Sequence, residues 1–428
     1  MINKIKSLTN TEDKRRLLSN FFSLSVLQGA NYILPLITLP YLVRVLGVEY
    51  FGLLAFATAT VAYFQILTDY GFNLTATREV SIHRDNKEKV IEIFSSVMTI
   101  KFMLMFVSFL LLTVLVFSFE KFSKDALVYL LTFGTVIGQV LFPVWFFQGM
   151  ERMKYITYLN ILSKVIFTIA IFVFVHEQSD YYLVPLLTSI GFLVAGIWSL
   201  YLVKKKFDVS FTFQKVETIK HYLVNGWDIF MQRFYVSLYT TTNLIILGVF
   251  TNNTVVGYYS IASKIIEIFR QFFTIISQVF FPYFAKKFSE NQYAAFLILF
   301  KISKYMLLLS TISFILILIF GEYIVAFISG EHIYESIELL NILTIGVIIV
   351  PFFSLYTSAL VSIGYSKDLN KIARNSVVIS IPLSLLLIYH YEAVGLACLV
   401  VILQYYIASH YFYLLHNYYK TEIQVSKK

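Results

Sequence analysis

The chain has 428 residues, of which 58% are apolar or aromatic and only 14% are charged, against roughly 25% charged residues in soluble domains. Twelve membrane helices of about 20 residues each would need about 240 apolar-rich residues, which is close to the apolar content of this chain. The composition therefore excludes an ordinary globular cytosolic enzyme and favours a polytopic helical membrane protein.

The net charge of +9 does not indicate nucleic-acid binding, because the lysines and arginines stand in short clusters between apolar stretches. The single cysteine, Cys398, lies within the last apolar stretch, so the chain can form no internal disulfide and no cysteine-based metal cluster. A polar and basic segment, residues 1–16, precedes the first apolar stretch, which lacks a small-residue cleavage site. We expect no cleaved signal peptide and a first stretch that stays as a helix.

Twelve apolar stretches are long enough to cross the bilayer as helices. In chain order they occupy residues 17–43, 50–73, 91–118, 126–147, 155–175, 181–203, 221–249, 256–281, 302–320, 336–362, 372–390 and 394–416. The sequence therefore predicts an all-α polytopic membrane protein with twelve transmembrane helices, arranged as two six-helix lobes around a central cavity.

Basic residues are distributed unevenly over the connections between these stretches. Most of the 34 lysines and arginines fall before the first stretch, in the even-numbered connections or in the C-terminal tail, and the odd-numbered connections hold only Arg44, Lys121 and Lys124. The longest outward connection, residues 321–336, carries three glutamates and neither lysine nor arginine. By the positive-inside bias, both termini are predicted to be cytoplasmic.

The longest inward connection begins KKKFD and separates two sets of six helices. We predict an N-terminal six-helix lobe over residues 1–205, a cytoplasmic inter-lobe linker over 206–220 and a C-terminal six-helix lobe over 221–428. Because each set has an even number of helices, both sets enter from the cytoplasm, as in a parallel repeat.

A weak internal repeat supports this division. Gly47 and Gly52 in the first hairpin match Gly248 and Gly257 in the hairpin between the seventh and eighth stretches. The alternative interpretation is that any tight hairpin shows glycine at its bend.

Polar side chains follow one face of four stretches, at the helical spacing of three and four residues. Their members are Asn20, Gln28, Asn31 and Thr38, with Pro35 on the same face, in the first stretch, Thr58, Gln65, Asp69 and Asn73 in the second, Asn225, Asp228, Gln232, Tyr235 and Tyr239 in the seventh, and Ser260, Ser263, Lys264, Glu267, Gln271, Thr274 and Gln278 in the eighth, with Arg270 at the border. These are the first two helices of each half, where we expect the cavity. The alternative for single polar residues is hydrogen bonding between helices.

Charged residues inside the stretches are the stronger candidates, because a charge at a helix centre costs about 2.5–3.5 kcal/mol on insertion scales. The candidates are Asp69, Lys164, Asp228, Arg233, Lys264, Glu267 and Arg270. The last three could instead form a self-contained triad at i,i+3 spacing, and Lys164 could snorkel towards an interface. Lys101, in the third stretch, is expected to snorkel rather than to bind a ligand.

Other motifs point away from enzyme chemistry. The seven histidines form no metal-binding spacing, and no nucleophile elbow, phosphate loop or dinucleotide fingerprint stands in a usable context. A GxxxG motif at Gly134 and Gly138 is typical of a helix contact. We therefore predict neither metal, cofactor nor catalytic residues.

Two segments resemble a known family. Residues 39–81 read LPYLVRVLGVEYFGLLAFATATVAYFQILTDYGFNLTATREVS, and residues 141–156 read LFPVWFFQGMERMKYI. Both are similar to the signatures of the Wzx-type polysaccharide repeat-unit (O-antigen) flippases, within the multidrug/oligosaccharidyl-lipid/polysaccharide exporter superfamily. With the number of stretches and the pattern of the connections, the resemblance covers essentially the whole chain, although the second half carries no motif of comparable strength.

The resemblance implies a flippase that moves an undecaprenyl-pyrophosphate-linked oligosaccharide, a precursor of O-antigen or capsule, across the bacterial inner membrane by ion-coupled alternating access. It implies a role in polysaccharide and lipopolysaccharide biosynthesis without enzyme chemistry. The implied partners are the lipid-linked oligosaccharide, membrane lipids, a proton or sodium ion for antiport, and the polysaccharide polymerase and chain-length regulator. The sugar composition, the coupling ion, the oligomeric state and the resting conformation do not follow from the sequence.

Site roles follow from the resemblance and the polar faces together. Substrate binding is assigned to Arg78, Arg233, Lys264, Arg270, Gln28, Asn31, Gln65 and Gln232, with the cations for phosphate or acidic sugars and the amides for sugar hydroxyls. Ion coupling is assigned to Asp69, Asp228 and Glu267. The position of Arg233 relative to the cavity is left open, because it lies off the centre of its polar face.

Two other functions compete with the flippase. A drug/cation antiporter of the same fold would need a cavity dominated by acids, whereas the stretches hold five basic residues and four acids, a mild imbalance in the other direction. A membrane polysaccharide polymerase or ligase would need a substantial outward loop with arginine or histidine, and the longest outward connection offers only His332.

Overall fold

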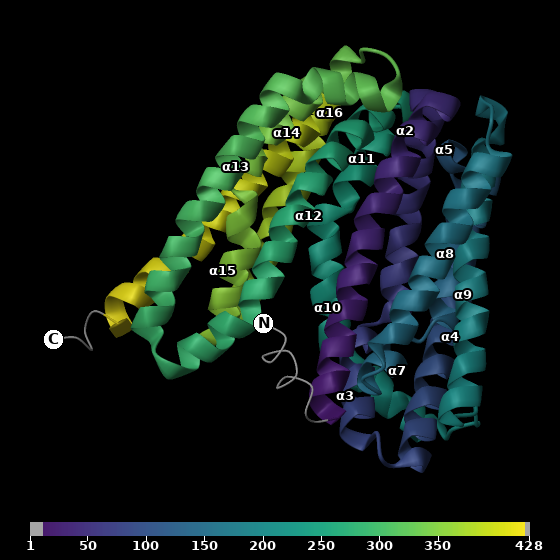
Figure 1. Cartoon of the computed structure of the whole chain (residues 1–428). Helices are drawn as coiled ribbons and strands as arrows, with labels where there is room; N and C mark the ends of the chain where they lie inside the picture. Colours follow the sequence, from purple (N-terminus) through teal and green to yellow (C-terminus); the bar gives the residue numbers. More distant parts are fainter. Residues whose placement is uncertain (1–11, 424–428) are drawn as a thin grey trace. The chain divides into compact units, whose positions relative to one another are not determined.

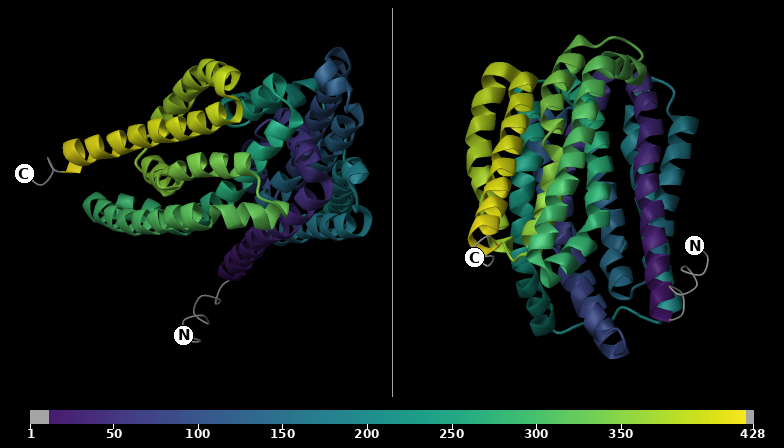
Figure 2. Two further views of the ribbon diagram at one scale, coloured as in Figure 1. Left: turned by 90° about the horizontal axis from the view of Figure 1, so that it is seen from above. Right: turned by 60° about the vertical axis from the view of Figure 1, so that its left-hand side comes forward.

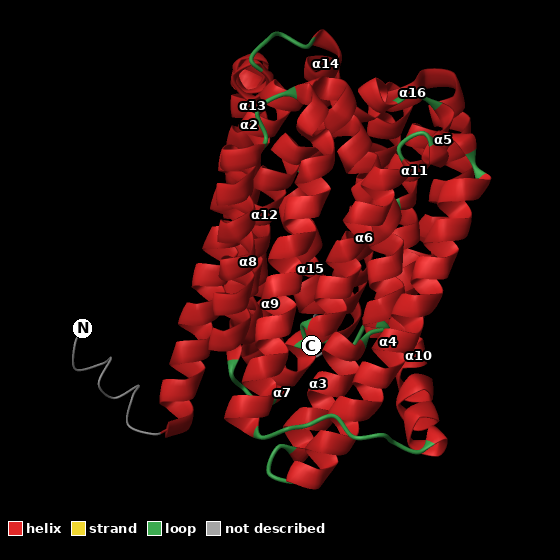
Figure 3. Cartoon of the chain, turned by 90° about the vertical axis from the view of Figure 1, so that its right-hand side faces the viewer, coloured by secondary structure: helices red, strands yellow, loops and turns green. Residues whose placement is uncertain are grey.

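The computed structural model describes residues 12–423, and within that range every regular element is a helix (Figure 3). The basic N-terminal residues 1–11 and the tail 424–428 lie outside the described residues. The elements of the first half are α2 (Glu12–Asp69), α3 (Phe72–His83), α4 (Lys87–Ser118), α5 (Glu120–Ser123), α6 (Ala126–Leu141), α7 (Val144–Gly149), α8 (Met153–Phe174), the 3-10 helix η1 (Gln178–Tyr182) and α9 (Leu183–Phe207).

The second half continues in the same way after a non-helical segment at residues 208–215 (Figure 1). Its elements are α10 (Val216–Thr240), α11 (Thr242–Phe250), α12 (Asn253–Glu290), α13 (Gln292–Ser329), α14 (Tyr334–Val347), α15 (Val350–Ser362), α16 (Ser366–Tyr418) and the short π-helix η2 (Tyr419–Ile423). The predicted all-α fold is confirmed, and each predicted stretch falls on one helix or on a broken pair.

Two long helices are each divided by a residue with positive φ. In α2 the break is at Gly47, with φ 74° and ψ 170°, and in α16 it is at Glu392, with φ 45° and ψ −126°. Each break separates two predicted stretches. The two halves of α16 form a hairpin, seen as yellow ribbons in Figure 2.

Seven of the described helices are long and apolar enough to cross a membrane, or eight if the bent pair α14 and α15, which meet at 42°, counts as one crossing. Two of the seven cover both halves of a broken helix. The helices α10 and α12 are not among them; α10 carries the charged residues Asp228 and Arg233, and α12 carries Lys264, Glu267 and Arg270. The chain is a multi-pass membrane protein, and the count of twelve crossings stays a prediction.

The surface of α4 carries many exposed apolar side chains. Met103, Phe106, Val114 and Phe117 are each 60–65% exposed, along a helix of high mean hydropathy. Apolar side chains exposed in such numbers would be unstable in water and require a lipid environment.

One predicted connection is wrong. The segment 321–336 was expected to be a loop, but α13 continues to Ser329 and ends at Gly330, whose φ of 84° is the left-handed conformation that closes many helices. The reason is the apolar run between the glutamates, Ile324 to Ile328, which extends the helix of the ninth stretch. Within the segment 321–336, only residues 330–333 lie outside helices.

Contacts divide the chain into two compact units. Unit 1 comprises Met1–Leu46 and Ala57–Phe234, and unit 2 comprises Gly47–Phe56 and Tyr235–Lys428. The helices α2 and α10 therefore contribute residues to both units. The predicted lobes and linker, which divide the chain between 205 and 221, stay a prediction.

Helix α7 supplies an aromatic core to unit 1. Its residues Trp145, Phe146 and Phe147 are fully buried between residues of α3, α4 and α9. Gly149, at the end of α7, lies against Val80 of α3 so closely that a Cβ would come within 2.6 Å of the Val80 Cβ. The second family motif is therefore a packing element that fixes the turn after α7.

The GxxxG motif of α6 is confirmed as a helix contact. Added Cβ atoms on Gly134 and Gly138 would lie 2.6 Å and 2.5 Å from the Cβ atoms of Ser189 and Phe192 in α9. Small residues allow the two helix backbones to approach closely, which is how membrane helices gain packing contacts.

The repeat glycines meet within unit 2. A Cβ on Gly52 would lie 1.8 Å from the backbone oxygen of Asn253 and 2.6 Å from the backbone nitrogen of Gly257. A Cβ on Gly257 would in turn lie 2.2 Å from the backbone oxygen of Val48. The two matching hairpins thus contact each other through Gly52 and Gly257. A general preference for glycine at bends would not by itself bring the two glycines into contact.

Candidate functional site

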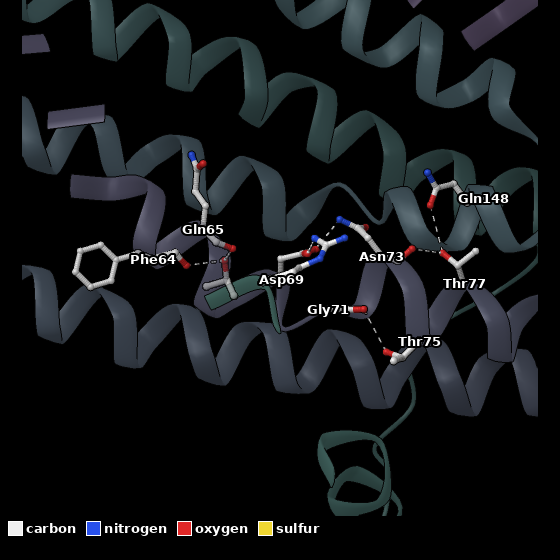
Figure 4. A network of polar contacts seen from close by, with 10 residues as sticks. Phe64, Gln65, Asp69, Gly71, Asn73, Thr75, Thr77 and Gln148 are labelled. Carbon is white, nitrogen blue, oxygen red and sulfur yellow. Dashed lines mark hydrogen bonds and ion pairs between the residues drawn. The ribbon is translucent and has the colours of Figure 1, made fainter. Parts of the chain in front are cut away.

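Asp69 is the centre of a charged network in unit 1. Its Oδ2 forms an ion pair with Nη1 of Arg233 on α10, and its Oδ1 accepts a hydrogen bond of 2.6 Å from Nδ2 of Asn73 on α3. Figure 4 shows Asp69 and Asn73 turned towards each other across the break between α2 and α3. The Asp69 side chain is 17% exposed and that of Arg233 is 39% exposed, so the pair is partly accessible.

The backbone break after Asp69 creates this arrangement. Tyr70 has a φ of 47° and Gly71 a φ of 75°, so two consecutive residues in the left-handed region end α2 and start α3 in a new direction. Asn73 is thereby placed to bond the carboxylate of the preceding helix.

Helix α10 packs directly on the break. The Tyr70 ring stacks on Phe230 with centroids 4.9 Å apart, and Gly226 lies beside Tyr70, where a Cβ would come within 2.8 Å of the ring. A Cβ on Gly71 would come within 2.6 Å of Ile229. This close packing brings Arg233, one turn further along α10, to Asp69.

Lys101 of α4 is a second cation near Asp69. It was expected to snorkel, but it is only 4% exposed, and its ammonium lies close enough to Asp69 for the two charges to attract. The snorkelling prediction is therefore wrong, because the side chain is buried within the unit. Nothing in one sequence reveals such a partner, and only the cost of a charge within an apolar helix marks Lys101 as a candidate.

The predicted amide ligands of unit 1 have different surroundings. Gln65 donates a hydrogen bond of 3.0 Å from Nε2 to Oγ1 of Thr135 on α6. Gln28 and Asn31 are half-buried on α2. Gln232 is exposed on α10.

Three charged candidates of unit 1 lie apart from the Asp69 pair. Arg78 is exposed on α3, and Asp228 is exposed on α10. Lys164 is half-buried on α8, so both of its interpretations stay open. The structure therefore brings Asp69 and Arg233 together and leaves these three outside the pair.

Glu267 organises the corresponding cluster in unit 2. Its Oε2 pairs with Nη2 of Arg270, and its Oε1 accepts a hydrogen bond of 2.7 Å from Nε2 of Gln271. Glu267 is half-buried, whereas Lys264 and Arg270 are exposed on the same helix. The i,i+3 pair of the triad interpretation is present for Glu267 and Arg270.

The two clusters share one chemistry. Each holds a carboxylate that keeps a guanidinium in place and is itself hydrogen-bonded by an amide, Asn73 in one case and Gln271 in the other. Among the described residues no group of three or more His, Cys, Asp or Glu side chains could hold a metal ion. Such clusters can bind an anion through the arginine or a small cation through the carboxylate.

Comparisons with known proteins identify the family of this chain. The family model described as "Polysaccharide biosynthesis protein" matches residues 17–288. A curated relative from Escherichia coli (strain K12), named "Putative O-antigen transporter", is 34% identical over 270 residues, which are 63% of this chain and 65% of the relative. The match thus spans about two thirds of the length of that relative.

Solved structures show the fold. An inward-facing multidrug resistance MATE family transporter of the MOP superfamily aligns with a TM-score of 0.70 and 14% identity, covering 91% of this chain and 96% of that one. The lipid II flippase MurJ, in an inward closed conformation, aligns with a TM-score of 0.68 and 15% identity, covering 94% and 87%. The chain therefore has the fold of these transporters.

Proposed function

This chain belongs to the polysaccharide biosynthesis protein family, and on that premise we propose that it is a flippase for a lipid-linked polysaccharide precursor. The cargo is an undecaprenyl-pyrophosphate-linked oligosaccharide for O-antigen or capsule, moved across the bacterial inner membrane by alternating access with both termini in the cytoplasm. The observation that carries this proposal is the similarity to a relative named as an O-antigen transporter, across 63% of the chain. No covalent bond of the cargo changes, so no catalytic residue is needed.

The paired charges support a coupling mechanism. While Asp69 is ionised, it holds Arg233, and while Glu267 is ionised, it holds Arg270. A proton or sodium ion that neutralises a carboxylate releases its arginine, and a free guanidinium binds phosphate oxygens strongly. Ion binding and cargo binding would then be coupled through the same pairs, because each carboxylate that takes up an ion frees an arginine for the cargo.

The remaining assigned residues take supporting roles in this proposal. Lys264 adds positive charge on the same helix as Arg270, and Arg78 meets the diphosphate at the cytoplasmic side. The amides of Gln28, Asn31, Gln65 and Gln232 bind sugar hydroxyls, and Asp228 serves ion coupling. The polymerase and the chain-length regulator act on the cargo after it has crossed.

The drug/cation antiporter remains the second candidate, because the MATE family transporter has the same fold. A site for hydrophobic cations would require carboxylates free of cationic partners. Asp69 and Glu267 are instead paired with arginines, which favours an anionic cargo.

Deletion in the native host tests the proposed function. We expect loss of surface polysaccharide and accumulation of a single completed repeat on its lipid carrier, on the cytoplasmic leaflet. Repeats that reach the outer leaflet without being polymerised would favour a polymerase. Unchanged polysaccharide together with new sensitivity to cationic drugs would favour the antiporter.

Arg270→Ala tests the assigned cation in unit 2. We expect surface polysaccharide to fall about tenfold with normal membrane insertion, because insertion is helped by the loss of a charge within a span. Arg374→Ala is the matched control, since Arg374 is an exposed arginine on α16 outside the proposed site. Normal polysaccharide in the Arg270 variant would refute the assignment.

A further inference from the structure

A cavity of about 600 Å³ is lined by residues of unit 1, none of which belongs to the charged pairs. Its walls come from the connection between α3 and α4, from the turn between α7 and α8 with the first residues of α8, and from the last turn of α9. In the predicted topology these residues lie in or next to even-numbered connections, which the distribution of basic residues predicts on the cytoplasmic side. The proposed function so far uses none of its residues.

Basic side chains dominate the wall of this cavity. Arg84, Arg152, Lys154 and Lys206 line it, against a single carboxylate in the lining, Asp85. The four cations come from three separate parts of the chain, so they are brought together by the fold and not by one local run of sequence. Arg152, Lys154 and Lys206 are exposed, and their charges face solvent at the mouth.

The strained turn before α8 adds a fixed contact. Glu151 has a φ of 54°, unfavourable for a residue other than glycine, and its Oε2 lies 2.7 Å from Nη1 of Arg84. Strain of this kind is retained where the surrounding structure requires one particular geometry. The ion pair thereby links the connection between α3 and α4 to the turn between α7 and α8.

The N-terminus of α8 opens into the same space. Arg152 occupies the capping position of this 22-residue helix, and no side chain caps it. The first backbone N–H groups of a helix and its dipole favour an anion at this position. They supplement the four cations, of which Arg84 and Lys206 come from outside α8.

Aromatic residues form a rigid floor. Tyr155 packs on Phe147 and Phe207 with ring centroids 5.6 Å and 5.9 Å away, and Phe147 is fully buried in the unit 1 core. The ammonium of Lys154 lies 5.2 Å from the Tyr155 centroid. The cations at this site are therefore attached to a fixed frame rather than to a free loop.

We propose that this cavity is a binding site for a phosphate ester at the membrane surface, distinct from the charged pairs within the spans. Arginine and lysine at the mouth contact the phosphate oxygens, and the α8 N-terminus completes the site. The phosphate can come from the diphosphate of the cargo carrier or from the headgroup of an anionic lipid. The first source rests on the proposed function, and the second does not.

Lys206→Gln and its neighbour Lys205→Gln form the matched test. Lys206 lines the cavity, whereas the ammonium of Lys205 contacts the Tyr201 hydroxyl at 2.7 Å. The full chain is reconstituted in nanodiscs of phosphatidylcholine, and binding of farnesyl diphosphate is measured. A second arm measures retention of phosphatidylglycerol from mixed nanodiscs by native mass spectrometry. We expect Lys206→Gln to weaken binding about tenfold and Lys205→Gln to leave it within about twofold.

Each outcome decides the proposal. A selective loss of farnesyl diphosphate binding supports the site with a carrier diphosphate, and a selective loss of phosphatidylglycerol supports it with a membrane lipid. Equal losses in both variants, or binding of neither probe by the wild type, would overturn it. Arg152→Gln repeats the test on another wall if Lys206→Gln fails to fold. Normal polysaccharide in a deletion strain would refute the proposed function, whereas the phosphatidylglycerol result would still stand on its own.

Discussion

The role proposed for Asp69 depends on the side chains around its carboxylate. A lone carboxylate within a membrane helix would be protonated or expelled, whereas this one is paired with Arg233, accepts a hydrogen bond from the Asn73 amide and attracts the buried ammonium of Lys101. Two cations around one acid leave an excess of positive charge. That excess is compatible with an anionic cargo that binds when the carboxylate releases its arginine.

Asp69→Asn tests this role directly. The substitution keeps a side chain that can bond Asn73 but removes the charge that holds Arg233, so the arginine stays unpaired throughout the cycle. We expect transport to fall about tenfold or more, which corresponds to about 1.4 kcal/mol or more. The measurement is uptake of labelled lipid-linked oligosaccharide in proteoliposomes. Recovery of transport in the double variant with Asp69→Arg and Arg233→Asp would show that the pair is structural only.

Lys101→Met separates stability from function. A buried ammonium is costly, and an apolar side chain of similar length removes that cost while Asp69 keeps Arg233 as its partner. We expect an equal or higher unfolding temperature in detergent together with transport reduced about fivefold. Lys304→Met, which changes an exposed lysine of α13, is the control. A variant with full transport would mean that Lys101 has no functional part.

At the scale of elements, the two glycine-marked hairpins illustrate how close packing constrains sequence. Gly52 of α2 and Gly257 of α12 are in backbone contact, and the left-handed Gly47 turns the chain just before that contact. Only glycine satisfies both requirements without displacing a neighbouring backbone.

Gly52→Ala should therefore destabilise unit 2. The added methyl would lie 1.8 Å from the Asn253 backbone oxygen, which cannot move aside as a side chain would. We expect a loss of about 1–3 kcal/mol, seen as a lower unfolding temperature of the purified protein. Gly29→Ala is the matched control on the same helix, because a Cβ there has nothing within 4 Å. Equal unfolding temperatures in the two variants would contradict the packing described here.

Sequence patterns predicted the positions of the helices better than the contacts between side chains of different helices. Hydropathy located each stretch, since lipid-facing and packed faces are both apolar, and the GxxxG contact followed from small residues alone. The extension of α13 to Ser329 was missed because its glutamates suggested a loop. The contacts of Arg233 and Lys101 were not predictable, since they depend on the turn at Tyr70 and Gly71 and on packing between distant helices.

At the scale of the molecule, the connection between α9 and α10 is attached to unit 1. The Lys87 ammonium bonds Asp208 and holds the pKa of that carboxyl below its ordinary value. Further along, Ser95 Oγ accepts a hydrogen bond of 3.0 Å from the Thr212 backbone nitrogen. The first part of the predicted linker is thus a structured edge of unit 1.

The single cysteine makes the orientation of the whole chain testable. In a Cys398→Ala background, Ser123→Cys probes an odd-numbered connection and Lys205→Cys an even-numbered one. Because basic residues cluster in the even-numbered connections, we expect a membrane-impermeant maleimide to label Ser123→Cys in intact spheroplasts and Lys205→Cys only after permeabilisation. The reverse pattern would invert both termini and place the basic cavity on the outer face. That result would leave the cavity able to bind lipid headgroups there, but it could no longer meet a carrier diphosphate before transport.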